Sequence, residues 1–275
     1  MLKSGIILLG LLLAASQAVA GPIAPECAAH FASGVAPELA KETLRDKTRL
    51  LCFEGFAVLH SGVSRTPLWS AEFLTAPRLG QARMLKRKNA YHEEARLPFW
   101  QRAELDDYTR SGFDRGHLSP SGNMTTDQEQ YESFSLANII PQHPRNNQVL
   151  WEGIEHSTRE LVFERGALYV VTGPIFEGEM LERINGRVLV PSHVFKAIYD
   201  PAGGQAGAYV AANAAGLNYE VVSIDALERR LGITLFPQLR SDIKTVAMAL
   251  PRPQPYKYRS QGKTMPSSGN HPIMR

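Results

Sequence analysis

Hydrophobic positions gather in several short runs along the chain, which is a pattern typical of strands in a sheet. These segments are rich in β-branched and aromatic residues and are bounded by Gly or Pro. They predict strands over residues 53–60, 67–74, 167–172, 194–199 and 208–211. The first strand is expected to end at Ser61 and Gly62, and the second is its expected partner.

Helical patterns are fewer. Residues 146–165 place apolar side chains among polar ones and end before Gly166, and residues 225–231 end before Gly232. Residues 38–49 are polar and compatible with a helix. Because strands outnumber helices, the sequence predicts an α+β fold built on a mostly antiparallel sheet.

The first 20 residues have the three parts of a signal peptide. Lys3 precedes an apolar run over residues 6–15, and small residues at 18–20 follow at the spacing that a signal peptidase requires. The run is shorter than the ~20 residues that span a membrane, which argues against a transmembrane anchor. Gly21, not a lipid-accepting Cys, follows the small residues at 18–20. We therefore expect cleavage before Gly21 and an exported chain, periplasmic or secreted, that has no membrane contact after cleavage.

The composition is that of an ordinary folded protein, with 44% hydrophobic and 21% charged residues among 275. It excludes a collagen, a disordered tail and a disulfide-dense miniprotein, and the formal net charge of +3 is too small to identify a partner. Cys27 and Cys52 are the only cysteines. An even number in an oxidising compartment favours one disulfide over two free thiols, and their wide separation is unlike that of zinc ligands.

We expect one domain over residues 51–250, preceded by an N-terminal arm over 21–50 and followed by a proline-rich basic tail over 251–275. Within the domain, residues 83–96 contain five Lys or Arg side chains together with aromatic rings. Surfaces that bind nucleic acids combine cations and aromatic rings in this way. A solvated loop is the alternative for the same residues.

The densest group of reactive side chains is Asp114-Arg115-Gly116-His117. A carboxylate, a guanidinium and an imidazole stand within four residues, and the glycine lets the backbone bend closely. An imidazole that titrates near neutrality can take a proton from water, and a guanidinium can bind two phosphate oxygens. The group therefore favours chemistry on a phosphate. A surface Asp–Arg pair beside a buried histidine is the alternative.

A second group repeats at intervals of four residues, namely Asn147, Trp151, Glu155 and Arg159. At about 100° per residue, each step drifts by only about 40° around a helix, so these side chains share one side. Asn147 can offer an oxygen to a hard cation, Glu155 can hold the waters of that cation, and Arg159 can reach a scissile phosphate. The alternative is a salt bridge between Glu155 and Arg159, and for Trp151 we expect a position in the core.

Together these groups resemble the DNA/RNA non-specific endonucleases, which include mitochondrial endonuclease G and secreted bacterial sugar-non-specific nucleases. The resemblance runs from about residue 56 to about residue 237, in the order of the family. It is carried by SGFDRGHLSP at 111–120, LANIIPQ at 136–142, Asn147, Trp151, Glu155, TGPIF at 172–176, VPSHVFK at 190–196 and LERRLGI at 227–233.

The resemblance implies a ββα-metal core, also called a His-Me finger, in which a strand carries His117 and the following helix carries Asn147. His117 would be the general base that activates water, and Asn147 would be the one direct protein ligand of a magnesium ion. Two positions depart from the family. Ile140 replaces a small residue, and Asn146 leaves the metal ligand ambiguous by one position. We choose Asn147, because it keeps the four-residue step to Trp151.

The resemblance also assigns supporting roles. Glu155 would position the waters of the metal ion, and Arg115 and Arg159 would stabilise negative charge on the phosphate. Asp114 and Asn138 would hold these reacting groups in place.

By the same resemblance, the cofactor is Mg²⁺, for which Mn²⁺ can substitute, and DNA and RNA bind through their phosphate backbones. Such a site contacts neither a base edge nor a sugar hydroxyl, so we expect cleavage of both polymers with 5′-phosphate ends. A homodimer is compatible with the resemblance. Two other hypotheses stay open: a catalytically silent nucleic-acid-binding protein, and a phosphodiesterase of a narrower substrate.

Overall fold

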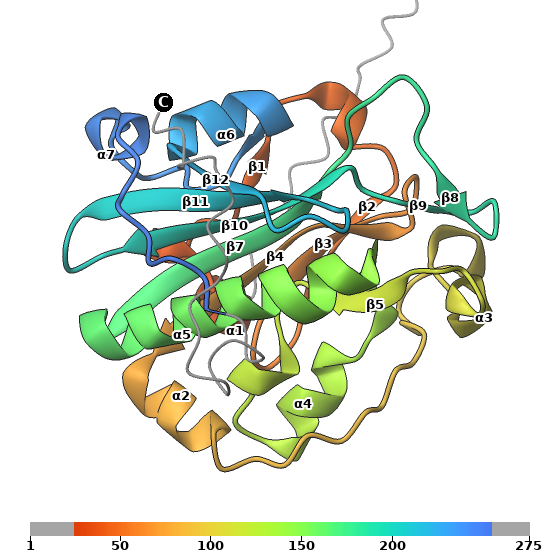
Figure 1. Ribbon diagram of the computed structural model, residues 1–275, viewed down its shortest axis with the longest axis horizontal. Coiled ribbons are helices and arrows are strands. Elements are labelled where there is room, and N and C mark those ends of the chain that lie inside the picture. Colours follow the sequence, from red (N-terminus) through yellow and green to blue (C-terminus); the bar gives the residue numbers. More distant parts are fainter. Residues whose placement is uncertain (1–24, 255–275) are drawn as a thin grey trace, which may run out of the picture.

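The computed structural model describes residues 25–254, so the predicted signal peptide and residues 255–275 of the predicted tail lie outside the described range. Within it, one large sheet has helices on both faces (Figure 1). The predicted α+β class with a mostly antiparallel sheet is confirmed. No helix among the described residues is long and apolar enough to cross a membrane.

Seven strands form the central sheet in the order β12-β11-β10-β7-β4-β3-β2, and all neighbours are antiparallel. The strands are β2 (Thr48–Cys52), β3 (Ala57–Ser61), β4 (Thr66–Thr75), β7 (Ala167–Ile175), β10 (His193–Asp200), β11 (Gln205–Ala212) and β12 (Tyr219–Val222). The five predicted strands correspond to β3, β4, β7, β10 and β11, because each is a β-rich run. Most residues of these strands are buried, since both faces of the sheet are covered.

Smaller elements surround this sheet. Three further strand pairs are β1 (Glu38–Leu39) with β13 (Ile233–Thr234), β5 (Asp114–His117) with β6 (Ile139–Gln142), and β8 (Arg183–Ile184) with β9 (Val188–Leu189). The α-helices are α1 (Pro25–Ala28), α2 (Ala76–Ala82), α3 (Leu105–Tyr108), α4 (Asp127–Ser133), α5 (Glu152–Arg165), α6 (Ile224–Leu231) and α7 (Ser241–Thr245). Short helical turns are η1 (Ala32–Gly34), η2 (Glu42–Leu44), η3 (Phe99–Gln101), η4 (Ser121–Asn123), η5 (Leu136–Asn138) and the π-helical η6 (Asn146–Trp151).

Two of the three predicted helices are confirmed. The prediction for residues 225–231 corresponds to α6, and the prediction for 146–165 corresponds to η6 followed by α5. Both helices end at a glycine with positive φ, as expected for a residue that tolerates this conformation. The first turns of the longer helix are widened into a π-helix, a feature that is frequent at functional sites.

The predicted helix over residues 38–49 is wrong. This segment contains β1, η2 and the start of β2. Leu39 pairs with Ile233 near the other end of the chain, and Arg45 donates a hydrogen bond to the carbonyl oxygen of Leu39 at 2.7 Å. Lys47 has a φ of 53°, which a continuing helix does not allow. Because β2 spans residues 48–52, the predicted arm runs without a break into the sheet.

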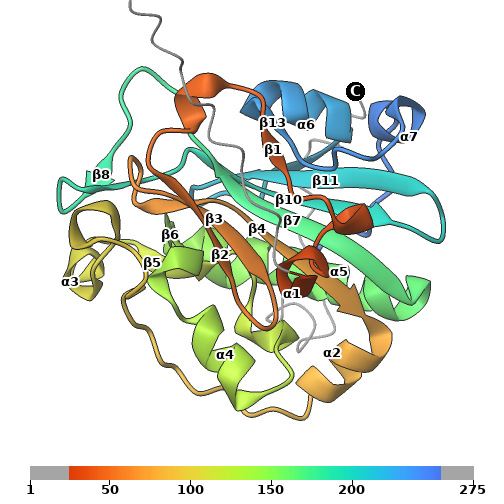
Figure 2. The ribbon, with the colours of Figure 1, turned by 180° about the vertical axis from the view of Figure 1, so that it is seen from behind.

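The two faces of the sheet are covered differently. Strand alternation on β4 directs Trp69 and Ala71 to one face, which we call the apolar face, where they pack with buried residues of α6 and the N-terminal segment. Figure 2 shows the N-terminal segment, with α1 and β1, on this side of the sheet. The disulfide between Cys27 and Cys52 links that segment to β2, as the cysteine count predicts. The opposite face is covered by α5 and is called the α5 face (Figure 1).

Candidate active site

A ββα unit carries the predicted site residues. Strand β5 consists of residues 114–117, pairs with β6, and is followed along the chain by η6 and α5 (Figure 1). Gly116 is required for a local reason, because a Cβ at this position would lie 2.0 Å from Oε1 of the buried Gln142. The absence of a side chain lets β5 approach Gln142 closely.

His117 ends β5 and is buried between two aromatic rings. The Phe134 ring packs edge-on against it with the centroids 4.8 Å apart, and the Tyr91 centroid lies 5.5 Å away. Burial, and after it the positive charge of Arg87, lowers the pKa of His117 from 6.5 to about 3. Its Nε2 is buried without a hydrogen-bond partner among the described residues. The imidazole is therefore neutral near pH 7, the form that can accept a proton.

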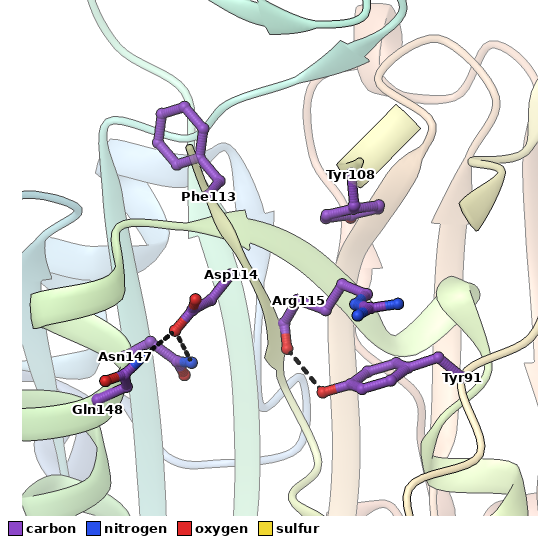
Figure 3. Close-up of a pocket in the computed structure, with 7 residues that line it drawn as sticks. All are labelled: Tyr91, Tyr108, Phe113, Asp114, Arg115, Asn147 and Gln148. Carbon is purple, nitrogen blue, oxygen red and sulfur yellow. Dashed lines mark hydrogen bonds between the residues drawn. The ribbon is translucent and has the colours of Figure 1, made fainter. Parts of the chain in front are cut away.

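Asp114 joins β5 to the start of the helix. Nδ2 of Asn147 and Nε2 of Gln148 each donate a hydrogen bond to Oδ2 of Asp114 at 2.9 Å (Figure 3). Asp114 and Asn147 are 33 residues apart in the sequence, so this contact connects the two predicted motifs. No described residue donates a hydrogen bond to Oδ1 of Asn147, which leaves this oxygen available to a cation.

The neighbouring Asn146 is placed differently. It is fully buried, its Oδ1 accepts a hydrogen bond from Gln142 at 2.6 Å, and its Nδ2 donates to the carbonyl oxygen of Ala212 at 2.8 Å. Both ends of this amide are therefore used to join β6, η6 and β11. Of the two adjacent asparagines, Asn147 is the one with an available oxygen at the site.

Arg115 lies on the other side of β5 from Asp114 (Figure 3). Its guanidinium lies 4.3 Å from the centroid of the Tyr91 ring, and the Tyr91 hydroxyl donates a hydrogen bond to the Arg115 carbonyl oxygen at 3.1 Å. A pocket of about 300 Å³ opens here. It is lined by Tyr91, Tyr108, Phe113, Asp114, Arg115, Asn147 and Gln148. One pocket therefore exposes a guanidinium and the asparagine proposed to bind the metal.

Glu155 and Arg159 form the i, i+4 pair that the spacing predicts. Nη1 of Arg159 lies 3.9 Å from Oε2 of Glu155, and Trp151 is 1% exposed and belongs to the core, as expected. Burial raises the pKa of Glu155, while the positive charges of Arg159 and Lys196 oppose the rise. Among the described residues, neither Glu155 nor Arg159 makes a direct hydrogen bond to Asn147 or His117.

Asn138 holds the segment that follows His117. Its Oδ1 accepts a hydrogen bond from the backbone N–H of Ser119 at 3.0 Å, and its Nδ2 donates to the carbonyl oxygens of Ser119 and Ser133 at 2.8 and 2.9 Å. Asn138 is completely buried. It therefore positions the site without lining it.

The basic segment over residues 83–96 is partly neutralised by acidic partners. Its ion pairs are Arg83–Glu160, Lys88–Asp127 and Arg96–Glu94. Arg87 differs, because its guanidinium lies 5.1 Å from the Phe134 ring centroid and donates to Oγ of Ser121 at 3.0 Å. Arg87 therefore brings positive charge next to His117, which the sequence analysis did not anticipate.

Three further polar residues near the site, Glu72, Asn123 and Lys196, were not predicted as site residues from the sequence. All three are buried, and Asn123 bonds both to Glu72 and to Arg159. A signal was present in the sequence, because Glu72 and Lys196 are the only charged residues within the predicted strands 67–74 and 194–199. A charge at an inward strand position is uncommon unless it is paired or functional.

The donor set is compatible with a magnesium ion. The available Oδ1 of Asn147 is a hard, neutral oxygen, and the Asp114 carboxylate that orients it adds negative charge nearby. Magnesium prefers oxygen ligands and keeps several waters, so one or two protein oxygens are enough to bind it.

Comparisons with known proteins agree with the geometry. The family of DNA/RNA non-specific endonucleases matches residues 37–242. Mitochondrial nuclease EXOG of Danio rerio is 34% identical over 66% of this chain and 60% of its own length. Human mitochondrial endonuclease G is 32% identical over 74% of each chain, and a Nostoc nuclease is 27% identical over 81% of this chain and 86% of its own. The chain thus spans less than two thirds of the EXOG protein and about three quarters of endonuclease G.

A solved structure supports the fold. A chain in the crystal structure of the EndoG/EndoGI complex aligns with a TM-score of 0.62 at 23% identity, over 70% of this chain and 88% of that chain. This likeness shows that the two chains share a fold. In this chain, the β5–β6 pair and the helix that follows it form the ββα unit. The chain belongs to the DNA/RNA non-specific endonuclease family, whose members are metal-dependent hydrolases of phosphodiester bonds. The predicted family, fold class and enzyme class are confirmed.

Proposed function

We propose that the protein is an exported, magnesium-dependent, sugar-non-specific endonuclease that hydrolyses phosphodiester bonds of DNA and RNA. One observation carries the proposal, namely the hydrogen bond between Asn147 and Asp114. This contact joins the strand of His117 and Arg115 to the helix of the Glu155–Arg159 pair. One compact unit then carries a base, an amide oxygen and guanidinium groups. These are the functional groups that phosphodiester hydrolysis requires.

In this proposal His117 is the general base. Its neutral ring takes a proton from water while the water oxygen forms a bond to phosphorus, and the bond from phosphorus to the 3′ oxygen breaks. The 3′ oxygen leaves with the electron pair of that bond and takes a proton from solvent water. The phosphate then stays on the 5′ end of the product. Burial makes the free imidazole a weak base. The negative charge of a bound phosphate favours the imidazolium and so raises the pKa of His117 during the reaction.

The remaining residues would bind the metal ion, orient its water molecules and stabilise negative charge. Asn147 would hold the magnesium ion through Oδ1, and Glu155 would orient water molecules around it. When bound, this ion supplies positive charge that stabilises the transition state of phosphoryl transfer. Arg115 and Arg159 add positive charge on the protein side.

Asp114 and Asn138 act through their neighbours. Asp114 fixes the Asn147 amide, and Asn138 fixes Ser119, two residues after His117. Both are positioning residues in this proposal.

The proposal includes the substrate range and the compartment. Binding through phosphates is independent of base and sugar, so DNA and RNA are both substrates, and affinity falls as salt rises. The signal-peptide pattern and the Cys27–Cys52 disulfide support a periplasmic or secreted enzyme. Homodimer formation stays a prediction, which sedimentation of the mature chain tests.

The deciding experiment is cleavage of supercoiled plasmid and of total RNA by the mature protein and by His117→Ala, each with Mg²⁺ and with EDTA. We expect the wild type to cut both polymers with Mg²⁺, and we expect EDTA or His117→Ala to abolish cutting. End-labelling of the products reports the position of the phosphate. A wild type that binds nucleic acid but cuts neither polymer would favour the silent binding protein, and turnover of small phosphodiesters alone would favour the narrower substrate.

A further inference from the structure

A row of polar side chains crosses the α5 face of the sheet beneath the proposed site. Ser70 and Glu72 of β4, Thr172 of β7 and Lys196 of β10 share this face, because Ser70 lies opposite Thr172 and Thr172 lies opposite Lys196. Each of the four is at most 1% exposed, and their neighbours on this face are apolar. Buried polar and charged groups cost free energy unless they are well paired, so the row calls for a physical explanation.

The row contacts two segments of the proposed site. Oγ of Ser70 lies 2.7 Å from Oγ of Ser119, in the segment that follows His117. Glu72 accepts a hydrogen bond from Nδ2 of Asn123 at 3.0 Å, and Oδ1 of Asn123 accepts one from Nη1 of Arg159 at 3.4 Å. A buried chain of contacts therefore leads from the sheet to the guanidinium proposed to face the phosphate.

The chemistry of Glu72 determines how the Asn123 amide is turned. A carboxylate only accepts hydrogen bonds, so Asn123 must direct its NH₂ group towards Glu72. The amide oxygen then points to the other side, where Arg159 donates to it. Glu72 is 1% exposed, so solvent does not compete for this bond.

Lys196 balances the buried charge. Its Nζ donates a hydrogen bond to Oγ1 of Thr172 at 2.7 Å and lies 5.6 Å from the centroid of the Trp151 ring. Burial raises the pKa of Glu72 and lowers the pKa of Lys196, and the charge of each opposes the shift of the other. With Glu155 and Arg159 included, two acidic and two basic side chains occupy this region, and their formal charges cancel.

We propose that Glu72 is a positioning residue that aims the Arg159 guanidinium at the scissile phosphate through Asn123. The positive charge of Lys196 offsets the free-energy cost of burying the Glu72 carboxylate. The inference rests on the proposed function, because the action of Arg159 on a phosphate belongs to that function.

Glu72→Gln is the direct test, because glutamine keeps the shape but can both donate and accept, so it no longer dictates the orientation of Asn123. A misplacement of about 1 Å can cost on the order of 100-fold, so we expect kcat on plasmid DNA to fall about tenfold or more, with KM changed less than about twofold. In an Arg159→Ala background, the same substitution should change kcat less than about twofold, because coupled residues are not additive.

Two further variants separate positioning from folding. Glu72→Gln removes one of the two carboxylates that act on Lys196, so the double variant Glu72→Gln/Lys196→Met restores charge balance and protects the fold. Glu164→Gln is the matched control, since Glu164 is an exposed residue of α5 that pairs with Arg165, away from this cluster. It should cleave at the wild-type rate. Thermal unfolding of every variant is measured beside the kinetics.

The outcomes are distinct. A wild type that cleaves neither DNA nor RNA would overturn the proposed function and this inference with it. An active wild type with an equally active Glu72→Gln, or with equal losses in both backgrounds, would overturn the positioning role alone. Failure of both Glu72 variants to fold would assign Glu72 to stability and would also overturn it. A kcat loss that disappears in the Arg159→Ala background supports the inference.

Discussion

On β4, Trp69 and Ala71 point to the apolar face of the sheet, whereas Ser70 and Glu72 point to the α5 face. The same division recurs on β10, where Phe195 packs in the apolar face and Lys196 lies on the other. Trp69, Ala71 and Phe195 therefore bury apolar area on one face. On the other face, buried polar side chains take the place of apolar ones and make contacts to the site. The comparison teaches that both faces bury apolar side chains, but strand alternation confines the polar residues that contact the site to one of them.

The largest expected effect is on the α5 side. His117→Ala removes the proposed base, and general-base catalysis contributes about 100-fold to 10,000-fold, so plasmid cleavage should fall by that factor. Initial rates of supercoiled-plasmid nicking measure it. The contrasting variant is Phe195→Leu on the apolar face, which should lower the free energy of unfolding by about 1 kcal/mol and leave kcat of the folded protein unchanged. Equal kcat losses in the two variants would contradict the separation.

The adjacent asparagines sharpen the comparison at one point in the chain. Asn147→Ala removes the proposed metal oxygen, so cleavage should fall by about 100-fold and need more Mg²⁺, with little change in melting temperature. Asn146→Ala leaves buried partners unpaired and should instead lower the free energy of unfolding by about 1–3 kcal/mol. Mg²⁺ titrations of activity and thermal melts distinguish the two. The reverse pattern would move the metal site to Asn146.

The disulfide tests the apolar face alone. Cys27→Ser/Cys52→Ser opens a loop with a sequence separation of 25 residues. Loop-entropy arguments predict a loss of about 3 kcal/mol from the free energy of unfolding, measured by urea denaturation. We expect kcat of the folded protein to stay within about twofold of wild type, because the polar contacts of the α5 face are untouched. A strong kcat loss without a stability loss would show that the two faces are coupled.

A smaller effect concerns the pH dependence of stability, to which the buried His60 contributes. Burial lowers the pKa of His60 from 6.5 to about 4, so between these values the unfolded chain binds more protons than the folded one. The neutral His60 therefore contributes its full share to the free energy of unfolding above pH 6.5. As the pH decreases this contribution is lost, by about 2 kcal/mol at pH 5. His60→Gln, which keeps a donor for the Gln101 carbonyl oxygen, should flatten the dependence of unfolding free energy on pH. An unchanged slope would contradict the low pKa, and His117 is expected to contribute in the same direction.

Much of the fold could be predicted because its signals are local. The β-rich composition of β3, β4, β7, β10 and β11 lies within each strand, and the glycines that end α5 and α6 stand next to the last helical residue. The failure over residues 38–49 has the opposite cause. Leu39 finds its partner in Ile233, almost two hundred residues away, and no local pattern reports such a pairing.

The site residues also fall into two groups, those that local sequence predicts and those that depend on tertiary contacts. His117 and Arg115 were predictable because they stand in one tetrapeptide, and Asn147 because helical spacing links it to Trp151. Whether Asn146 or Asn147 faces the site depends on the contact of Asn146 with Ala212, which is a tertiary fact. The role that we propose for Glu72 also depends on tertiary contacts, because Asn123 lies between Glu72 and Arg159.

Gly116 carries a consequence for the interpretation of genetics. It has no reactive atom, yet any larger residue would collide with Gln142, which also holds Asn146 in place. In a saturation-mutagenesis screen scored by loss of nuclease phenotype, Gly116 should therefore be as intolerant as His117. The two positions become distinguishable only when protein abundance is scored in parallel, because variants at Gly116 should disappear from the folded pool while His117→Ala remains in it.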